Sequence, residues 1–264
     1  LTPRTRAAVA ALEAAGVMPV LCTGRSVAGT RPVHDELALQ RPFVAYNGHW
    51  IGQPGEEPWH TIQIPDEQQS AIRRIEDRAS FSFRHSAERK ISLLSDHPEH
   101  LRIAAWYRNV TLLQVRDELP DRDLMRVSAF FQGHDDQVEA AWASLEGSAA
   151  AALHKEVFPL SLFPDYKDSD LVLCEIQAQS RGKAEAFGWL ASEHGIRAER
   201  TIAVGDHCND RTMLAGAGLS VCPANAATEV RHLADMFIGH HAEEGFASWI
   251  EEGAPFHDPA EHIL

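Results

Sequence analysis

Residues 201–210, T-I-A-V-G-D-H-C-N-D, join a short apolar run to a cluster of polar side chains. The first four side chains suit a strand and predict a buried β-strand that ends at Gly205. Asp206 and Asp210 follow, with Asn209 beside the second aspartate. Carboxylates at the carboxyl end of a parallel strand suit Mg²⁺, which binds one or two carboxylates together with water and substrate phosphate. The alternative is that Asp206 or Asn209 only caps the helix that follows.

Helix and strand patterns alternate before and after this stretch. The predicted elements are a helix over 3–15, a strand over 17–22, a helix from 26 towards 39, a strand over 43–46, a helix over 183–194, a strand over 201–204, a helix over 209–215, a strand over 219–222, a helix over 226–234, a strand over 236–238 and a helix over 242–251. Such alternation is typical of a parallel sheet with right-handed crossovers. The two ends of the chain therefore predict one α/β core.

The block between them has a different pattern. Strands are predicted over 61–64, 124–131 and 171–176, and helices over 66–79 and 135–145. Strands and helices that do not alternate regularly indicate an α+β domain. We therefore expect residues 51–171 to form a domain inserted into the α/β core.

Composition narrows the possible partners and environment. The chain has 264 residues and a formal net charge of −14, which argues against a nucleic-acid backbone or an anionic membrane as the main partner. Its four cysteines contain no C-x-x-C pair, and no apolar run reaches the length of a membrane span. We expect reduced thiols in a cytoplasmic protein, and nothing in the sequence determines an oligomeric state.

Two further loops carry groups that suit a phosphate. Thr23 ends a predicted strand and, with Gly24, offers a hydroxyl and backbone N–H groups to an oxyanion, and Arg25 follows. An ordinary turn capped by Thr23 is the alternative. Lys183 begins a predicted helix, where the macrodipole opposes a cation unless an anion shares the site. A solvated lysine is the alternative there.

The order of these features resembles the haloacid dehalogenase superfamily. A strand leads into Thr-Gly-Arg at 23–25, Asn-Gly follows at 47–48, Gly-Lys at 182–183 opens a helix after a long insert, and G-D-x-x-N-D stands at 205–210. The chain is most similar to the Cof-type (class IIB) phosphatases, whose cap domain lies between the second and third motifs. The resemblance implies an α/β fold with a Rossmann-like parallel-sheet core and an inserted α+β cap domain of the C2 type.

The resemblance also sets the domain limits and the phosphate-binding residues. Residues 1–50 and 172–264 would form the hydrolase core, and 51–171 the cap. Thr23 would bind the transferring phosphoryl group, with Gly24 and Arg25 beside it, and Asn209 would contact phosphate. The implied partner is a small phosphorylated metabolite, with no nucleic acid and no membrane.

The catalytic cation and the metal follow from the same resemblance. Lys183 would stabilise the phosphoryl group, although Arg181 remains a rival for this role. Asp206 would hold Mg²⁺, and Asp210 would support the metal or the lysine. Phosphoryl transfer requires charge neutralisation and positioning, which these groups supply.

One motif of the family is missing from these residues. The family begins with an apolar strand that ends in Asp-x-Asp, whose first aspartate forms an aspartyl-phosphate. Asp121-Arg122-Asp123 and Asp168-Ser169-Asp170 do not end an apolar strand. We therefore expect the nucleophile to lie outside residues 1–264. The predicted function is Mg²⁺-dependent hydrolysis of a small phosphomonoester, such as a sugar phosphate. The alternatives are a phosphate-binding protein without catalysis and a phosphomutase of the same superfamily.

Overall fold

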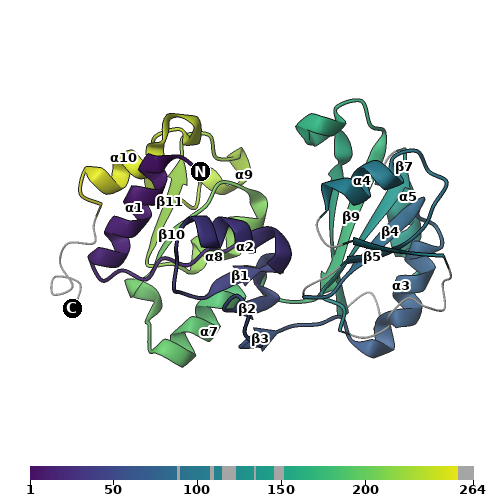
Figure 1. Ribbon diagram of the computed structural model, residues 1–264, viewed down its shortest axis with the longest axis horizontal. Helices are drawn as coiled ribbons and strands as arrows, with labels where there is room; N and C mark the ends of the chain where they lie inside the picture. The colour runs from purple at the N-terminus through teal and green to yellow at the C-terminus, as the bar shows by residue number, and fades with distance from the viewer. Residues whose placement is uncertain (88–89, 108–109, 115–122, 134, 146–151, 255–264) are drawn as a thin grey trace. The chain divides into compact units, whose positions relative to one another are not determined.

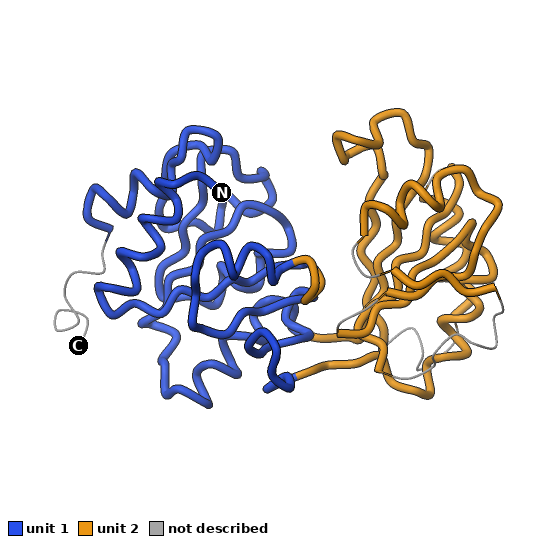
Figure 2. Tube along the Cα trace, viewed as in Figure 1, with its two compact units in different colours: residues 1–25, 30–60, 181–264 blue, residues 26–29, 61–180 orange. Residues whose placement is uncertain are grey.

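The computed structural model covers residues 1–264 and describes all of them except 88–89, 108–109, 115–122, 134, 146–151 and 255–264 (Figure 1). The chain divides into two compact units (Figure 2). Unit 1 consists of Leu1–Arg25, Thr30–His60 and Arg181–Leu264, and unit 2 consists of Ser26–Gly29 and Thr61–Ser180. The units thus divide after His60 and after Ser180, later in the chain than the sequence limits of 50 and 171.

The stretch 201–210 enters a parallel sheet in unit 1. This sheet contains β10 (Ile202–Val204), β11 (Leu219–Pro223) and β12 (Met236–Ile238) in that order. Both neighbouring pairs are parallel, with Ile202 opposite Leu219 and Val221 opposite Met236. The parallel strands and the intervening helices confirm the predicted α/β class.

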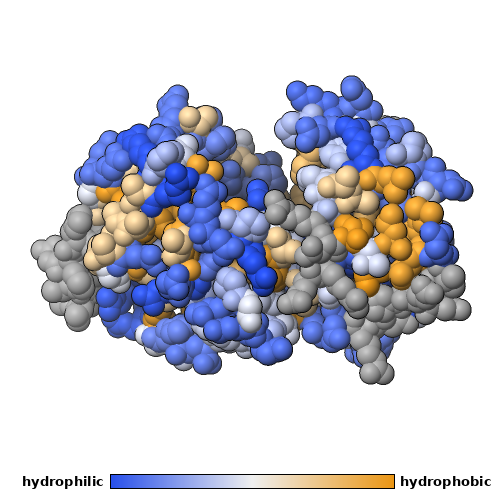
Figure 3. All heavy atoms as spheres, viewed as in Figure 1, coloured by the Kyte–Doolittle hydropathy of each residue, from blue (hydrophilic) through white to orange (hydrophobic). Residues whose placement is uncertain are grey.

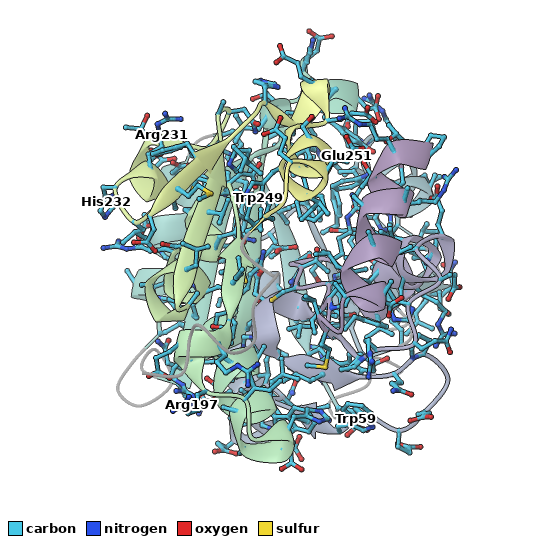
Figure 4. All side chains as sticks on the ribbon, turned by 90° about the vertical axis from the view of Figure 1, so that its left-hand side faces the viewer. Trp59, Arg197, Arg231, His232, Trp249 and Glu251 are labelled. Atoms are coloured by element: carbon cyan, nitrogen blue, oxygen red, sulfur yellow. The ribbon has the colours of Figure 1, made fainter. Side chains whose placement is uncertain are left out.

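Helices surround this sheet. They are α1 (Pro3–Ala14), α2 (Val27–Glu36), α7 (Ala184–His194), α8 (Arg211–Gly216), α9 (Thr228–Arg231) and α10 (Gly245–Glu251). Ala203 and Cys222 pack in a cluster with residues of α8 and α9. Val221 packs in a separate cluster with Trp249, which Figure 4 shows on α10. The sheet is therefore covered by apolar contacts from several helices.

The first helix forms as its sequence predicts. The Thr2 hydroxyl accepts a hydrogen bond from the Thr5 N–H, Pro3 is the first helical residue, and Gly16 follows the helix at φ +79°. Helix α1 lies beside α10 (Figure 1), and Arg4 binds Glu251 through Nε and Oε1 at 2.9 Å. The first and last helices of unit 1 are thus joined directly.

Residues 17–22 do not form the predicted strand. They make an isolated parallel bridge between Cys22 and Val44, which lies in β1 (Phe43–Ala45). Pro19 has no N–H to contribute to a ladder, and β10 lies at the edge of its sheet in the part of the chain that the structure describes. The other side of β1 pairs with β2 (Trp50–Gly52), which pairs in turn with β3 (His60–Thr61). Because β2 pairs with β1 and β3 pairs with β2, unit 1 extends to His60, past the predicted limit at residue 50.

Unit 2 contains a six-stranded sheet in the order β6-β5-β4-β7-β9-β8. Its strands are β4 (Phe81–His85), β5 (Lys90–Leu93), β6 (Val110–Leu113), β7 (Arg126–Gln132), β8 (Leu153–Pro159) and β9 (Leu171–Ala178), and its helices are α3 (Gln69–Glu76), α4 (His100–Trp106) and α5 (Asp135–Ala143). Neighbouring strands are antiparallel except for β5 and β6. The sequence predicted β7, β9, α3 and α5 but assigned no element to β4, β5, β6, β8 or α4.

The two faces of this sheet have separate apolar clusters. Val127, Ala129 and Phe131 of β7 pack with residues of α3 and α5. Phe130, which alternates with them, packs with Phe83 and α4 residues in the second cluster. Some nonpolar side chains of unit 2 remain exposed (Figure 3). Within the described ranges, none of the helices has the length and apolarity that crossing a bilayer requires.

Candidate active site

The turn after residue 22 is hydrogen-bonded to the turn after β1. The Thr23 N–H donates to the Val44 carbonyl at 3.0 Å, and the Asn47 N–H donates to the Thr23 carbonyl at 3.0 Å. Within the first turn, the Thr23 hydroxyl accepts from the Arg25 N–H at 3.2 Å. These bonds fix the Thr-Gly-Arg and Asn-Gly segments side by side.

A side-chain bond joins Asn47 to the stretch 201–210. The Asn209 amide donates from Nδ2 to the Asn47 Oδ1 at 3.1 Å. A Cβ atom added to Gly24 would stand 2.9 Å from the Asn47 Oδ1, so only glycine leaves this approach unhindered. Asn47 is buried and has φ 55° and ψ 39°, a left-handed conformation that asparagine tolerates better than most residues.

The segment before α7 meets the Asn-Gly turn at two glycines, Gly182 and Gly48. Gly48 has φ +97°, and a Cβ atom there would collide with the Gly182 carbonyl oxygen. Gly182, itself at φ +62°, directly precedes Lys183. The close backbone approach therefore places the start of α7 against the Asn-Gly turn.

Lys183 and Asp210 form a buried ion pair. The Lys183 Nζ lies 2.5 Å from the Asp210 Oδ1, and the two residues are only 6% and 4% exposed. Arg181 instead lies on the surface, where its Nε contacts Glu185 Oε2 at 2.9 Å. Of the two rival cations, Lys183 is therefore the one that meets the predicted aspartate.

The second oxygen of Asp210 holds the loop around it. The N–H groups of Asp206 and His207 donate to Asp210 Oδ2 at 2.9 Å and 3.0 Å. Gly205 permits this close turn, since a Cβ atom there would lie 2.6 Å from the Asp210 Cβ. Three donors thus contact the two carboxylate oxygens of Asp210, which fixes the end of β10.

Asp206 presents its carboxylate differently. Its side chain is exposed, while its backbone is held by the bond to Asp210 and by the Ala227 N–H, which donates to the Asp206 carbonyl at 2.8 Å. No set of three or more His, Cys, Asp or Glu side chains within the described ranges is arranged to hold a metal ion. Mg²⁺ does not require such a set, because it retains water and often binds one or two carboxylates. Asp206 on its fixed backbone fits a magnesium ligand, while Asp210 is already engaged by Lys183 and two amides.

A thiol lies close to the ion pair. Burial raises the pKa of the Cys22 thiol to about 12, while the nearby Lys183 ammonium lowers it by a smaller amount. Cys22 is thus a neutral thiol at physiological pH, which argues against a role as nucleophile.

The structure brings together most of the residues predicted from sequence. Thr23, Gly24, Asn209, Lys183 and Asp210 belong to one connected set of loops through the contacts above. Arg25 is exposed, and the contacts described above for it involve its backbone, so they do not bring its guanidinium to Lys183, Asn209 or Asp210. The residue that sequence reasoning missed is Asn47, whose signal was an Asn-Gly pair directly after a strand.

Comparisons with known proteins identify the family of the chain. The family model for haloacid dehalogenase-like hydrolases matches residues 1–250. The chain is 24% identical to the 5-amino-6-(5-phospho-D-ribitylamino)uracil phosphatase YitU of Bacillus subtilis, over 88% of this chain and 83% of that protein. It is also 24% identical to the pyridoxal phosphate phosphatase YbhA of Escherichia coli, over 95% of this chain and 91% of that protein. Among solved structures, the subclass IIB sugar phosphatase BT4131 matches with a TM-score of 0.73 and 17% identity, covering 96% of this chain and 91% of that one.

Proposed function

Since the chain belongs to the family of haloacid dehalogenase-like hydrolases and is a phosphoric monoester hydrolase of the Cof type, we propose that it hydrolyses a small phosphomonoester with Mg²⁺ through an aspartyl-phosphate. The observation that carries this proposal is the buried pair of Lys183 and Asp210, whose loops contact two further loops of unit 1, at Thr23 and at Asn47. The pair would hold an ammonium group in a fixed position for a phosphoryl group. Preorganised charge of this kind is often the largest contribution to catalysis of phosphoryl transfer.

Each proposed role follows from the chemistry of its side chain. The Thr23 hydroxyl, the backbone N–H of Gly24 and the Asn209 amide would bind phosphoryl oxygens. Lys183, fixed by Asp210, would offset the negative charge that develops during transfer. A Mg²⁺ ion held by Asp206 would supply further charge neutralisation when bound.

The reaction needs a carboxylate nucleophile in addition to these groups. Its oxygen would attack phosphorus while the bond from phosphorus to the leaving oxygen breaks, and that oxygen would take the bond electrons and a proton. Water would then hydrolyse the aspartyl-phosphate and release inorganic phosphate, which restores the carboxylate. Asp170, in the second Asp-x-Asp sequence, precedes β9 in unit 2 instead of ending a strand of unit 1.

The exposed edge of the parallel sheet leaves room for a further strand that could carry the nucleophile. β10 pairs only with β11 in the described part of the chain, and Val204 near its carboxyl end is 37% exposed. A parallel strand added at this edge would end near Gly205 and the Asp210 loop. We therefore propose that the aspartate nucleophile comes from a segment outside residues 1–264.

The proposed substrate class is a sugar phosphate or a similar phosphorylated metabolite. The two phosphatases described above are named for different substrates, and both of these substrates carry a phosphate group. The core loops would recognise the shared phosphate, and unit 2, as an inserted cap, would select the rest of the molecule.

The test is phosphate release by the protein as its native cell makes it, whose intact mass and N-terminal sequence are determined first. p-Nitrophenyl phosphate and a panel of sugar phosphates are assayed with Mg²⁺ and with EDTA. We expect Mg²⁺-dependent turnover that Asp206→Asn abolishes while the fold is retained. Full activity of that variant would refute the site, and binding of Mg²⁺ and phosphate without any turnover would favour the non-catalytic alternative.

A further inference from the structure

The turn that follows β1 has a strained backbone. Tyr46, Asn47 and Gly48 have φ values of 52°, 55° and 97°, so three consecutive residues lie in the left-handed region. Glycine adopts this region freely, whereas a bulky residue such as tyrosine is strained in it. Such strain persists only where the surrounding contacts impose it, and it is often found at functional sites. The contacts of this turn therefore show what the strained backbone achieves.

Hydrogen bonds within unit 1 hold the turn in place. The Tyr46 N–H donates to the Arg25 carbonyl at 2.9 Å, and the Asn47 N–H donates to the Thr23 carbonyl at 3.0 Å. His49 is 2% exposed, and its Nδ1 donates to the Tyr46 carbonyl at 2.8 Å. These bonds tie the turn to the Thr-Gly-Arg segment and so fix the direction in which the Asn47 side chain leaves the backbone.

The Asn47 side chain meets the loop at 205–210. Its Oδ1 accepts from the Asn209 Nδ2 at 3.1 Å, although the two residues are 162 positions apart. A Cβ atom added to Gly24 would stand 2.9 Å from the Asn47 Oδ1 and 3.5 Å from the Asn209 Nδ2. The Gly24 backbone therefore lies against both amides. Three of the loops that are proposed to bind the phosphoryl group or to support it meet at this point.

The bond determines which end of the Asn209 amide faces Asn47. A side-chain amide has an acceptor oxygen on one side and a nitrogen with two N–H donors on the other. The reversed orientation would place the Asn209 Oδ1 against the Asn47 Oδ1, so that two acceptors would face each other. With Nδ2 towards Asn47, one N–H is used in this bond and the other remains to donate to a phosphoryl oxygen. Asn47 thus favours the orientation in which Asn209 offers a donor to an anion.

A preference for the backbone conformation alone is the competing explanation. Asparagine tolerates the left-handed region better than most residues do, so Asn47 could be present only for its φ angle. Tyr46 has nearly the same φ angle, so this conformation does not by itself require asparagine. Glycine would fit the turn with less strain, but it has no side-chain acceptor for Asn209. The bond between the two amides therefore favours a role in positioning.

We propose that Asn47 is a positioning residue of the phosphatase site and acts through Asn209, by holding its amide with Nδ2 towards the phosphoryl group. This inference rests on the proposed phosphatase function and adds a residue to its site. The phosphoryl group would meet the second N–H of Asn209 beside the backbone N–H of Gly24. A donor that is fixed before the substrate binds needs no reorganisation during transfer, so it stabilises the charge that develops on the phosphoryl oxygens.

The test is a double-mutant cycle in the protein as its native cell makes it. Asn47→Gly suits the left-handed backbone and removes the side-chain acceptor, and Asn209→Ala removes the donor. We expect Asn47→Gly to lower kcat/KM for p-nitrophenyl phosphate with Mg²⁺ roughly tenfold to a hundredfold, mainly through kcat, and Asn209→Ala to lower it at least as much. In the Asn209→Ala background, Asn47→Gly should lower kcat/KM by less than about twofold, because the amide that it orients is already absent.

A matched control separates the lost side chain from the added glycine. Ala38 has φ 54° in another turn of unit 1, so Ala38→Gly makes the same kind of backbone change and should leave kcat/KM unchanged within about twofold. Urea unfolding of each variant measures stability separately from activity. If Asn47→Gly does not fold, as judged by circular dichroism, the cycle uses Asn47→Asp, because aspartate also tolerates the left-handed region. The effect of Asn47→Asp on kcat/KM should then differ more than about threefold between the two backgrounds.

Two results would overturn the proposal. One is an unchanged kcat/KM in a folded Asn47→Gly variant, even if its stability falls, because that is the result of a purely structural role. The other is an equal effect of the Asn47 substitution with and without Asn209.

The affinity for inorganic phosphate, measured by isothermal titration calorimetry with Mg²⁺, provides a second cycle that does not depend on turnover. An active enzyme without coupling between the two residues refutes the positioning role alone. A protein without turnover whose phosphate affinity shows the coupling refutes the phosphatase proposal and supports the positioning role. A protein with neither turnover nor this coupling overturns both.

Discussion

Replacing Asp210 by asparagine should destabilise unit 1, whereas the same change at Asp206 should not. Asp210 is 4% exposed and accepts from three donors, namely the Lys183 ammonium and the N–H groups of Asp206 and His207. An asparagine at this position has one acceptor oxygen and one amide donor. Whichever way the amide is turned, it presents N–H groups either to the ammonium or to the two backbone N–H groups.

The expected magnitude follows from these contacts. Removing one partner of a buried ion pair leaves the other charge uncompensated and costs about 3–5 kcal/mol. The side chain of Asp206 is exposed, and surface substitutions away from special contacts change stability by less than about 0.5 kcal/mol. Asp206→Asn is therefore a control of the same chemical change, four residues away in the same loop.

Urea unfolding followed by tryptophan fluorescence measures the difference, since Trp50, Trp189 and Trp249 lie in unit 1. Hydrogen exchange provides a second measurement, because the amide protons of Asp206 and His207 are those bound by Asp210. They should exchange much faster in Asp210→Asn. Equal stability of the two variants, with unchanged exchange of these amides, would show that the pair does not hold the loop.

Three further predictions concern other parts of the chain. Gly48→Ala should lower the free energy of unfolding, measured by thermal unfolding, by about 2 kcal/mol more than Gly55→Ala. Both glycines have positive φ, but of the two only Gly48 faces a backbone carbonyl, so only there does the added methyl group also collide. Equal losses of stability in the two variants would contradict this. Lys183→Gln should abolish phosphate release, because it removes the buried ammonium that pairs with Asp210. Arg181→Gln should change kcat by less than about twofold, because the exposed ion pair of Arg181 with Glu185 contributes little free energy. If Arg181→Gln instead abolished phosphate release and Lys183→Gln did not, Arg181 would be the catalytic cation. The lowered pKa of Lys90, about 8 against an ordinary 10.5, means that the unfolded chain binds more protons between these values, so stability should rise with pH there. The rise should be smaller in Lys90→Met when unfolding free energies are compared from pH 7 to 10, and an identical slope would show that Lys90 has an ordinary pKa.

Local chemistry made the core helices predictable from sequence. In α1, Thr2 caps the first turn, Pro3 has the φ angle of a helix, and Gly16 takes the positive φ that ends it. Each signal acts within a few residues and does not depend on the remainder of the chain. The predicted class of fold follows from the repetition of such signals.

The strands of unit 2 were less predictable because their partners are distant and several buried positions are polar. In β4 and β5, Arg84, His85 and Lys90 are all at most 4% exposed, so the usual alternation of apolar and polar residues is lost. Arg84 is compensated by Glu76, eight residues earlier, through a bond of 2.6 Å. Such compensation between a helix and a strand cannot be read from a pattern with period two.

The candidate site also combines features that local sequence predicts with features that only tertiary packing determines. Glycine and aspartate spacing around Asp210 indicated the loop, because the tight turn needs Gly205. The choice between Arg181 and Lys183 depends on which of them faces the Asp210 carboxylate, and that is set by tertiary packing. The role of Asn47 depends likewise on Asn209, which is far away in the chain.

The interruption of unit 1 by unit 2 also bears on the order of folding. The segments of unit 1 before His60 and after Arg181 are separated by about 120 residues, and closing a flexible loop of that length costs about 4 kcal/mol in chain entropy. Unit 2 has its own apolar clusters, and its ends are drawn together when Ile64 binds Leu124 and β7 pairs with β9. If unit 2 folds first, the parallel sheet and the α1–α10 contact assemble across a short gap. Because synthesis proceeds from the amino terminus, the segments of unit 1 before His60 are made before unit 2, and β10 to β12 are made after it. Unit 1 can therefore complete its parallel sheet only after unit 2 has been synthesised.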